Sequence, residues 1–301
     1  MKSLRELYRI GKGPSSSHTM GPQKAATIFA GRNGGAASFE VTLYGSLAAT
    51  GKGHLTDKAI EEVLAPLAPT TIVWKPETTL EYHPNGMTFR AFGNDGTMTD
   101  EWTVFSIGGG ALSEGKEDGV LATPEVYGMN TLKEIMQWCL DNGRGYWEYV
   151  EECEGPEIWD FLQTGWAAMQ QSVENGLEHE GVLPGPLHLP RKAANYYIKT
   201  KSFRTSLQSR GLVFSYALAV SEENAAGGTI VTAPTCGSCG VVPSVLYHLS
   251  HGHDFSDKRI CHALATAGLF GNVVKHNASI SGAEVGCQGE VGVACAMASA
   301  A

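Results

Sequence analysis

The spacing of apolar residues changes along this chain, and the change limits the folds that it can form. In the first half, segments that alternate apolar and polar residues are interspersed with segments of helical spacing. Alternation predicts strands, because successive side chains of a strand point to opposite faces of a sheet. The predicted strands are 38–44, 70–74, 87–92 and 99–107, and the predicted helices are 21–32, 56–67 and 131–141. The pattern predicts an α/β domain over residues 1–153.

The second half has little strand signal. An acidic stretch at 148–160 and a stretch rich in proline and glycine at 181–190 predict a linker over residues 154–190. The helices expected beyond it are 193–200, 212–223, 241–249, 258–272 and 287–301, so residues 191–301 are predicted to be a helical domain. The predicted fold class is α+β, with an N-terminal α/β domain followed by a mostly α-helical domain. A length of 301 residues fits two domains.

Charge and hydropathy exclude several classes of protein. The formal net charge of −9 argues against a nucleic-acid-binding surface. No run approaches the ~18 apolar residues that a membrane helix needs, and residues 1–10 lack the apolar core of a signal peptide. We therefore expect a soluble cytoplasmic protein with no nucleic-acid or membrane partner. In that compartment the cysteines are expected to be free, catalytic or metal-bound.

Residues 13–22, Gly-Pro-Ser-Ser-Ser-His-Thr-Met-Gly-Pro, form the first candidate site. Hydroxyls and free N–H groups at a helix start can bind a carboxylate or a phosphate, and a histidine titrates near neutrality. The candidates are Ser15, Ser16, Ser17, His18 and Thr19. The alternative is a helix cap with an incidental histidine. A Gly-Pro pair on each side fixes the backbone, which favours a shaped site.

Five of the seven cysteines fall in the last 66 residues. Cys236 and Cys239 form a C-x-x-C motif, which has a metal or redox spacing of moderate specificity. Cys287 and Cys295 would lie about 12 Å apart along one continuous helix. One mononuclear ion could not easily bind both, whereas a cluster of several irons, or a helix break at Gly289 or Gly292, would allow it. Ordinary buried cysteines are the alternative.

Other polar groups are interpreted as structural. His248, His251 and His253 are expected in a solvent-exposed loop, because no cysteine pair has zinc-finger spacing to them. Cys139 and Cys153 are interpreted as structural, and the acidic stretch as a solvated face.

Together these segments closely resemble the iron–sulfur L-serine dehydratases (L-serine ammonia-lyases), over essentially the whole chain. The resemblance rests on residues 13–22, on Tyr44 to His54 (YGSLAATGKGH), on His83 to Met87 (HPNGM), and on the cysteine segments 233–240 and 279–295. It implies a beta-type N-terminal α/β domain, similar to a regulatory domain of phosphoglycerate dehydrogenase, and an alpha-type helical catalytic domain. Relatives continue past Ala301, where this sequence stops inside a helix-forming run, so we expect the helical domain to be incomplete.

The resemblance also implies a 4Fe–4S cluster held by Cys239, Cys287 and Cys295, with one iron left for L-serine. Cys236 departs from many relatives and is expected outside the ligand set. Dehydration of serine, on the way to pyruvate and ammonia, must remove a weakly acidic Cα proton and expel hydroxide, which a Lewis-acidic iron assists. His18 is the candidate base.

The remaining candidates concern the substrate and the partner. Ser15, Ser16, Ser17 and Thr19 would bind the substrate carboxylate or orient His18. Lys275, Asn277 and Ser281 are second-rank candidates for holding substrate or the surroundings of the cluster. The resemblance further implies a homodimer.

Other functions remain as alternatives. A pyridoxal-phosphate dehydratase would need a lysine in a recognisable context, and would leave the cysteines unexplained. A non-catalytic amino-acid-binding or regulatory protein would use the α/β domain and the serine-rich segment. A thiol or zinc metalloprotein would use the cysteines. Iron analysis separates these alternatives.

Overall fold

The structure is a computed structural model that describes residues 1–115, 124–280 and 282–301. Contacts between residues divide the chain into two compact units. The first, here called the sheet unit, is Pro14–Ala122, and the second, here called the helical unit, combines Met1–Gly13 with Thr123–Ala301. Among the described residues, no helix is both long enough and apolar enough to cross a membrane.

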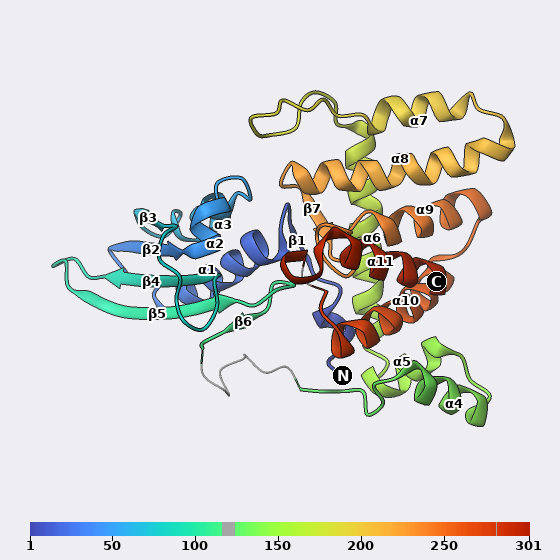
Figure 1. Ribbon diagram of the computed structural model, residues 1–301, viewed down its shortest axis with the longest axis horizontal. Coiled ribbons are helices and arrows are strands. Elements are labelled where there is room, and N and C mark those ends of the chain that lie inside the picture. Colours follow the sequence, from blue (N-terminus) through green and yellow to red (C-terminus); the bar gives the residue numbers. More distant parts are fainter. Residues whose placement is uncertain (116–123, 281) are drawn as a thin grey trace. The chain divides into compact units, whose positions relative to one another are not determined.

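The sheet unit is built on a five-stranded sheet with the strand order β3-β2-β4-β5-β6 (Figure 1). Its strands are β2 (Ser38–Tyr44), β3 (Thr70–Lys75), β4 (Gly86–Phe92), β5 (Met98–Ser106) and β6 (Leu112–Ser113). Only the β2–β3 pair is parallel among these described pairs, and the others are antiparallel. Its helical segments are η2 (Ser16–Met20), α1 (Gly21–Arg32), α2 (Gly45–Thr50) and α3 (Thr56–Leu64).

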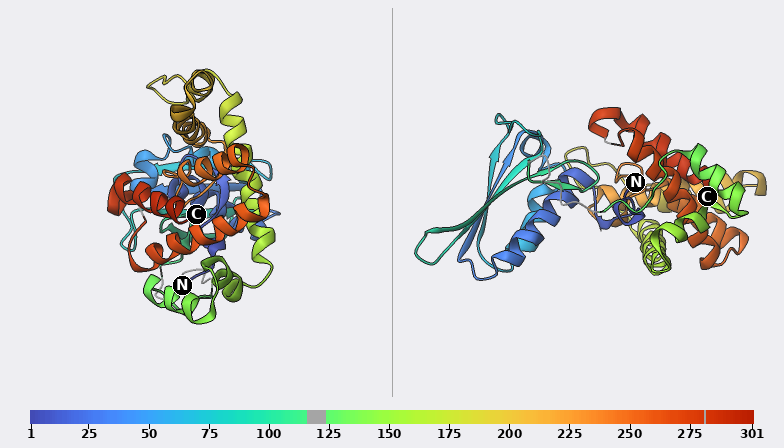
Figure 2. Two further views of the ribbon diagram at one scale, coloured as in Figure 1. Left: turned by 90° about the vertical axis from the view of Figure 1, so that its right-hand side faces the viewer. Right: turned by 90° about the horizontal axis from the view of Figure 1, so that it is seen from below.

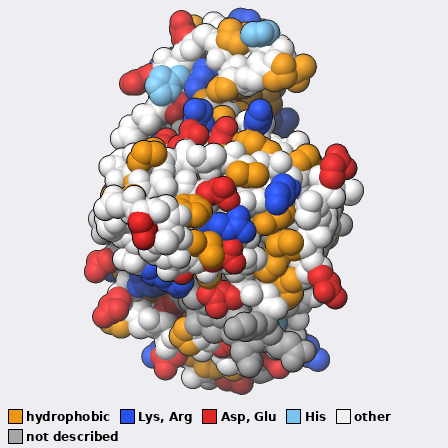
Figure 3. Space-filling view, turned by 90° about the vertical axis from the view of Figure 1, so that its left-hand side faces the viewer, with side chains coloured by type: hydrophobic (Ala, Val, Ile, Leu, Met, Phe, Trp, Pro, Cys, Tyr) orange, Lys and Arg blue, Asp and Glu red, His pale blue; other side chains and the backbone are white. Residues whose placement is uncertain are grey.

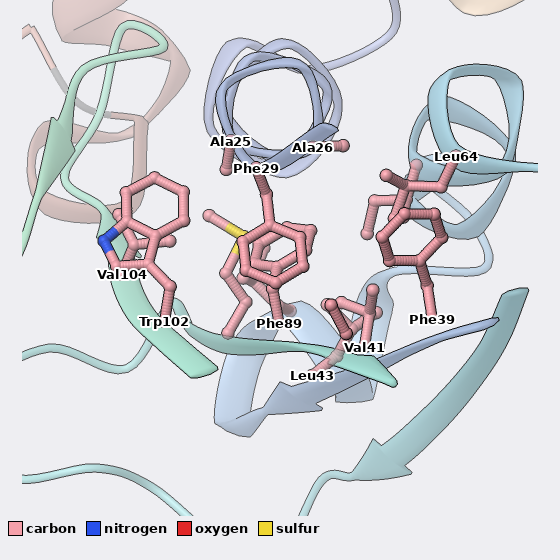
Figure 4. Packing of buried hydrophobic residues seen from close by; sticks show 14 of the residues in the cluster. Ala25, Ala26, Phe29, Phe39, Val41, Leu43, Leu64, Phe89, Trp102 and Val104 are labelled. Carbon is pink, nitrogen blue, oxygen red and sulfur yellow. The ribbon is translucent and has the colours of Figure 1, made fainter. Parts of the chain in front are cut away.

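Apolar side chains between the sheet and the helices α1 and α3 form the core of the sheet unit (Figure 4). Phe39 and Val41 of β2 are buried at alternate positions, and Val41 pairs in register with Phe89 of β4. Phe29 of α1 lies against these strands, with 5.4 Å between its ring centroid and that of Phe89 and a parallel stack on Trp102. In the first half of β2, the alternation that predicts the strand is therefore also the pattern of burial.

The helical unit consists mostly of α-helices (Figure 2). They are α4 (Leu132–Asn142), α5 (Tyr146–Glu154), α6 (Ile158–Glu178), α7 (Ala193–Lys201), α8 (Thr205–Ala225), α9 (Val241–His253), α10 (Asp257–Asn277) and α11 (Gly282–Ala300). A short 3-10 helix η1 (Leu4–Glu6) and a two-stranded antiparallel ladder of β1 (Ile10–Lys12) and β7 (Thr229–Val231) complete it.

The first residues of the chain are part of the core of the helical unit. The Tyr8 hydroxyl donates to the carbonyl of Leu264 in α10 at 3.0 Å. Gly268, one turn further along α10, allows this approach, because a Cβ there would lie 2.8 Å from the Tyr8 ring. Residues 1–13 thus belong with the C-terminal helices, although the sequence analysis assigned them to the α/β domain.

The predicted fold class is confirmed, and most predicted elements are present with small changes in their ends. The expected linker at 154–190 is not a simple connection, because Ile158–Glu178 of that stretch is helix α6. Its acidic residues concealed a helical stripe: Ile158, Leu162 and Trp166 are buried at spacings of four residues. The histidines expected in a loop lie instead in the last turns of α9.

Candidate active site

His18 lies in a helical turn that leads directly into α1. The turn, η2, begins after Ser15, whose side chain accepts a hydrogen bond from the His18 backbone N–H at 3.2 Å. Pro22 stands in the first turn of α1, where its fixed φ favours the helix and its missing N–H costs nothing. The serine-rich segment is therefore a capped helix entry that holds the backbone of His18 in place.

Both ring nitrogens of His18 are bonded to serine hydroxyls. Nδ1 lies 2.9 Å from Ser17 Oγ, and Nε2 lies 3.0 Å from Ser46 Oγ. Burial and, to a smaller extent, the neighbouring His54 lower the pKa of His18 to about 4, against the opposing effect of a hydrogen bond with Ser46. His18 is therefore neutral near pH 7, so one ring nitrogen donates to a serine oxygen and the other accepts from a serine hydroxyl.

His54 is the second imidazole of this site, with its ring centroid 4.7 Å from that of His18. Thr19 fixes its backbone, because Thr19 Oγ1 donates to the His54 carbonyl at 2.7 Å. His54 Nδ1 lies 3.1 Å from the Thr50 carbonyl oxygen, which can only accept. Nδ1 therefore carries the proton, and Nε2 of neutral His54 holds the lone pair.

His54 and Ser46 are site residues that were not predicted from the sequence. Both lie in the segment from Tyr44 to His54 that supports the family resemblance, and that was the signal available. Of the four predicted hydroxyl residues, Ser15 and Ser17 form hydrogen bonds with His18, and Thr19 bonds the backbone of the neighbouring His54. Thr19 and Ser16 are buried, Ser17 contacts the imidazole, and Ser15 caps the turn.

The three expected cluster ligands all belong to the helical unit. Cys239 lies just before α9 and is buried, whereas Cys287 and Cys295 lie on α11 and are exposed. Burial raises the pKa of Cys239 to about 12, and the Glu290 carboxylate adds to this. Cys239 is therefore a protonated thiol near pH 7 unless a cation offsets the cost of burying its charge.

Helix α11 is broken at Gly286, where φ is 67° and ψ is 178°. A left-handed φ of this kind favours glycine, which has no Cβ. The break falls immediately before Cys287, and not at Gly289 or Gly292. Cys287 and Cys295 therefore share one helical run, about 12 Å apart along its axis.

A close contact joins the two cysteine-bearing segments. A Cβ on Gly237 would lie 2.8 Å from Glu290 Oε2, so the loop between Cys236 and Cys239 lies against the stretch of α11 between Cys287 and Cys295. Three thiols from two touching segments suit an iron–sulfur cluster in donor type. Among the described side chains, no three of His, Cys, Asp or Glu converge on one point as metal ligands.

Lys275 and Asn277 hold the end of α10 against other segments of the helical unit. Lys275 Nζ donates to the Glu6 carbonyl at 2.7 Å, and burial lowers the pKa of this amine to about 8. Asn277 Nδ2 donates to the Asn130 carbonyl at 2.7 Å. Ser281, the third second-rank candidate, lies outside the described residues.

Comparisons with known proteins identify the family of the chain. Residues 3–72 match the family of the serine dehydratase beta chain, and residues 87–301 match that of the serine dehydratase alpha chain. The chain belongs to the serine dehydratase family. Among its relatives, an L-serine dehydratase of Haemophilus influenzae is 38% identical, over 100% of this chain and 78% of the relative. L-serine dehydratase 1 of Escherichia coli is 37% identical over the same shares.

A third serine dehydratase relative, from Streptomyces coelicolor, is 36% identical over 99% of this chain and 77% of its own length. The alpha-chain match begins at residue 87, inside β4, and so includes the last strands of the sheet unit.

Proposed function

We propose that this serine dehydratase family member converts L-serine into pyruvate and ammonia. Whole-chain similarity to proteins named L-serine dehydratase is the observation that carries the proposal. Loss of the Cα proton and the hydroxyl gives aminoacrylate and water. Tautomerisation to the imine and hydrolysis by one water then release pyruvate and ammonia, so the net reaction needs no external oxidant.

We propose a 4Fe–4S cluster held by Cys239, Cys287 and Cys295. The contact between Gly237 and Glu290 supports this ligand set, because it joins the two segments that carry the three cysteines. When bound, the cluster supplies a Lewis acid for departure of the serine hydroxyl. Cys239 must lose its proton on binding, because its thiol is neutral in dry surroundings.

We propose His18 as the base that removes the Cα proton. Its low pKa keeps it unprotonated across the physiological pH range, and Ser17 and Ser46 hold the plane of its ring. To accept a proton, His18 must exchange the bond from one serine hydroxyl for one to the substrate.

His54 competes for the same role on geometric grounds. The hydrogen bond from its Nδ1 to the Thr50 carbonyl leaves Nε2 as the proton-accepting nitrogen. His18 would then orient His54 by ring contact.

The substrate-binding candidates are Ser15, Ser16, Ser17 and Thr19, with Lys275, Asn277 and Ser281 in the second rank. The capped turn favours Ser15 and Ser17, because the partly exposed Ser17 hydroxyl bonds the His18 imidazole and the Ser15 hydroxyl lies 3.4 Å from that of Ser17. We also propose a cytoplasmic homodimer.

The test is anaerobic reconstitution of the full chain with iron and sulfide. We expect about four irons and four sulfides per chain, the visible absorption of an iron–sulfur protein, and pyruvate formation from L-serine. Zinc binding without iron would favour a zinc protein. Serine binding without iron or turnover would favour the regulatory alternative.

A further inference from the structure

A cavity of about 240 Å³ lies in the helical unit, where the first residues of the chain meet the end of α10 (Figure 1). The Asn272 side-chain amide donates to the Lys2 carbonyl at 2.7 Å, so it fixes the N-terminal segment against this helix. The residues that line the cavity come from three segments that are distant in sequence, and they are Lys2, Glu125, Asn272, Lys275 and His276.

The two lysines of this cavity have no acidic partner among the described side chains. Glu125, the acidic residue of the lining, lies 3.7 Å from the Met1 amino group. No salt bridge joins Lys2 or Lys275 to a carboxylate in the described ranges, and both residues are partly buried. On the face drawn in Figure 3, by contrast, acidic and basic side chains are interspersed. The cavity therefore presents two ammonium groups whose charge the described protein groups leave unpaired.

The groups around Lys275 Nζ add to this excess of positive charge. Burial, together with the cations of Arg9 and Lys2, lowers the pKa of this amine to about 8, against the opposing effect of Glu6. Glu6 is itself paired with Arg9, whose Nη1 is buried and forms no hydrogen bond with the described residues. Like charges disfavour the protonated amine, and an anion bound in the cavity would offset that repulsion.

We propose that this cavity binds a phosphate group, either as free phosphate or as the phosphate of a small ester. Two ammonium groups match the charge of a phosphate dianion, and lysine commonly binds phosphate as a point charge. A carboxylate monoanion would neutralise only one of them. The volume is several times the ~30 Å³ of a water molecule, so a phosphate fits. All lining residues belong to the helical unit, and the proposal does not depend on the catalytic one.

Calorimetric titration of the full chain with inorganic phosphate tests the site. Lys2→Gln and Lys275→Gln should each weaken binding at least about tenfold, because each removes a hydrogen bond from a cation to the anion. Lys275→Arg keeps the charge and should bind phosphate more tightly than Lys275→Gln. The matched control is Lys258→Gln, which changes an exposed lysine of the same helix outside the cavity and should bind phosphate like the wild type.

The same titration with glycerol 3-phosphate distinguishes the two sources of the phosphate group. Tighter binding of the ester would support a site for a small phosphate ester, because its organic part would then contact the rest of the cavity. Tighter binding of inorganic phosphate would support a site for the free ion. Binding that neither glutamine variant weakens would overturn the proposal.

Chemical labelling of the wild-type chain gives a second measurement, which does not depend on the folding of any variant. At pH 8 about half of the Lys275 amines are unprotonated and can react with acetic anhydride. Saturating phosphate should slow the acetylation of Lys275 and leave that of Lys258 unchanged, as measured by peptide mass spectrometry. Labelling that phosphate does not slow would contradict the site. Protection of Lys275 by L-serine and not by phosphate would overturn the proposal in favour of a substrate site.

Discussion

The imidazole site of the sheet unit and the cysteine segments of the helical unit differ in how far their geometry is already fixed. His18 is held by hydrogen bonds at both ring nitrogens and at its backbone. The cysteine segments touch through Gly237 and Glu290, but their thiols do not form a converged metal group among the described residues. The difference indicates that protein hydrogen bonds already fix the His18 imidazole, whereas the proposed cluster would have to draw its three ligands together.

The largest expected effect follows from removing a cluster ligand. Cys239→Ser should abolish both iron–sulfur content and pyruvate formation, because its thiolate is one of three proposed ligands. Cys261→Ser, in α10, is the matched control, since that thiol is also buried and has a raised pKa. Iron and sulfide analysis after reconstitution measures both. Full iron content in the Cys239 variant would contradict its role as a ligand.

The imidazole site should respond in the opposite way, with loss of turnover and retention of the cluster. His18→Ala is expected to lower kcat by about 10²–10⁴, the usual range for a general base. Absorption spectra and iron content should match the wild type. The same assay on His54→Ala separates the two imidazoles. A small loss for His18→Ala with a large loss for His54→Ala would transfer the base role to His54.

Acid stability should also distinguish the units. Folding lowers the pKa of His18 from 6.5 to about 4. Between these two pH values the imidazole is protonated in the unfolded chain and neutral in the folded chain. The contribution of His18 to the free energy of unfolding is therefore fully present above pH ~6.5. It is lost as the pH falls towards ~4, and the loss is at most about 3 kcal/mol. Urea unfolding of wild type and His18→Asn at pH 4–7 measures the difference. An unchanged pH dependence of stability in His18→Asn would contradict the lowered pKa of His18.

The smallest effect concerns the contact between the cysteine segments. Gly237→Ala would place its Cβ 2.8 Å from Glu290 Oε2. Because a flexible carboxylate can move, we expect a cost of only about 1 kcal/mol and a moderate loss of iron. Gly292→Ala is the control, since no atom lies within 4 Å of its added Cβ. Equal iron retention in both variants would show that the contact does not support cluster binding.

The sequence predicted much of the fold because burial follows simple periods in both units. The strands β2 to β5 and the capped helix α4 lie within one or two residues of their predicted ranges. Thr131 and Glu134 form the reciprocal cap that starts α4, and Gly143 ends it with a left-handed φ. Such capping signals depend on residues that are close in sequence, so they can be recognised without knowing the tertiary contacts of the helix.

The predictions that required correction depended on distant contacts. The expected linker contains α6, whose residues Leu162 and Trp166 are buried. This helix packs against helices that come much later in the chain, such as α8 and α10. Residues 1–13 join the helical unit through β7 and α10, which no local pattern indicates.

The sequence by itself determined the fold class, the family and the residues with suitable chemistry. Residue type and spacing carry that information, because the positions of thiols and imidazoles and the spacing of apolar residues can be read directly from the sequence. Only the tertiary structure placed His54 beside His18 and brought Gly237 against Glu290. These relations depend on distances between segments separated in sequence, and folding sets such distances through burial of the whole core.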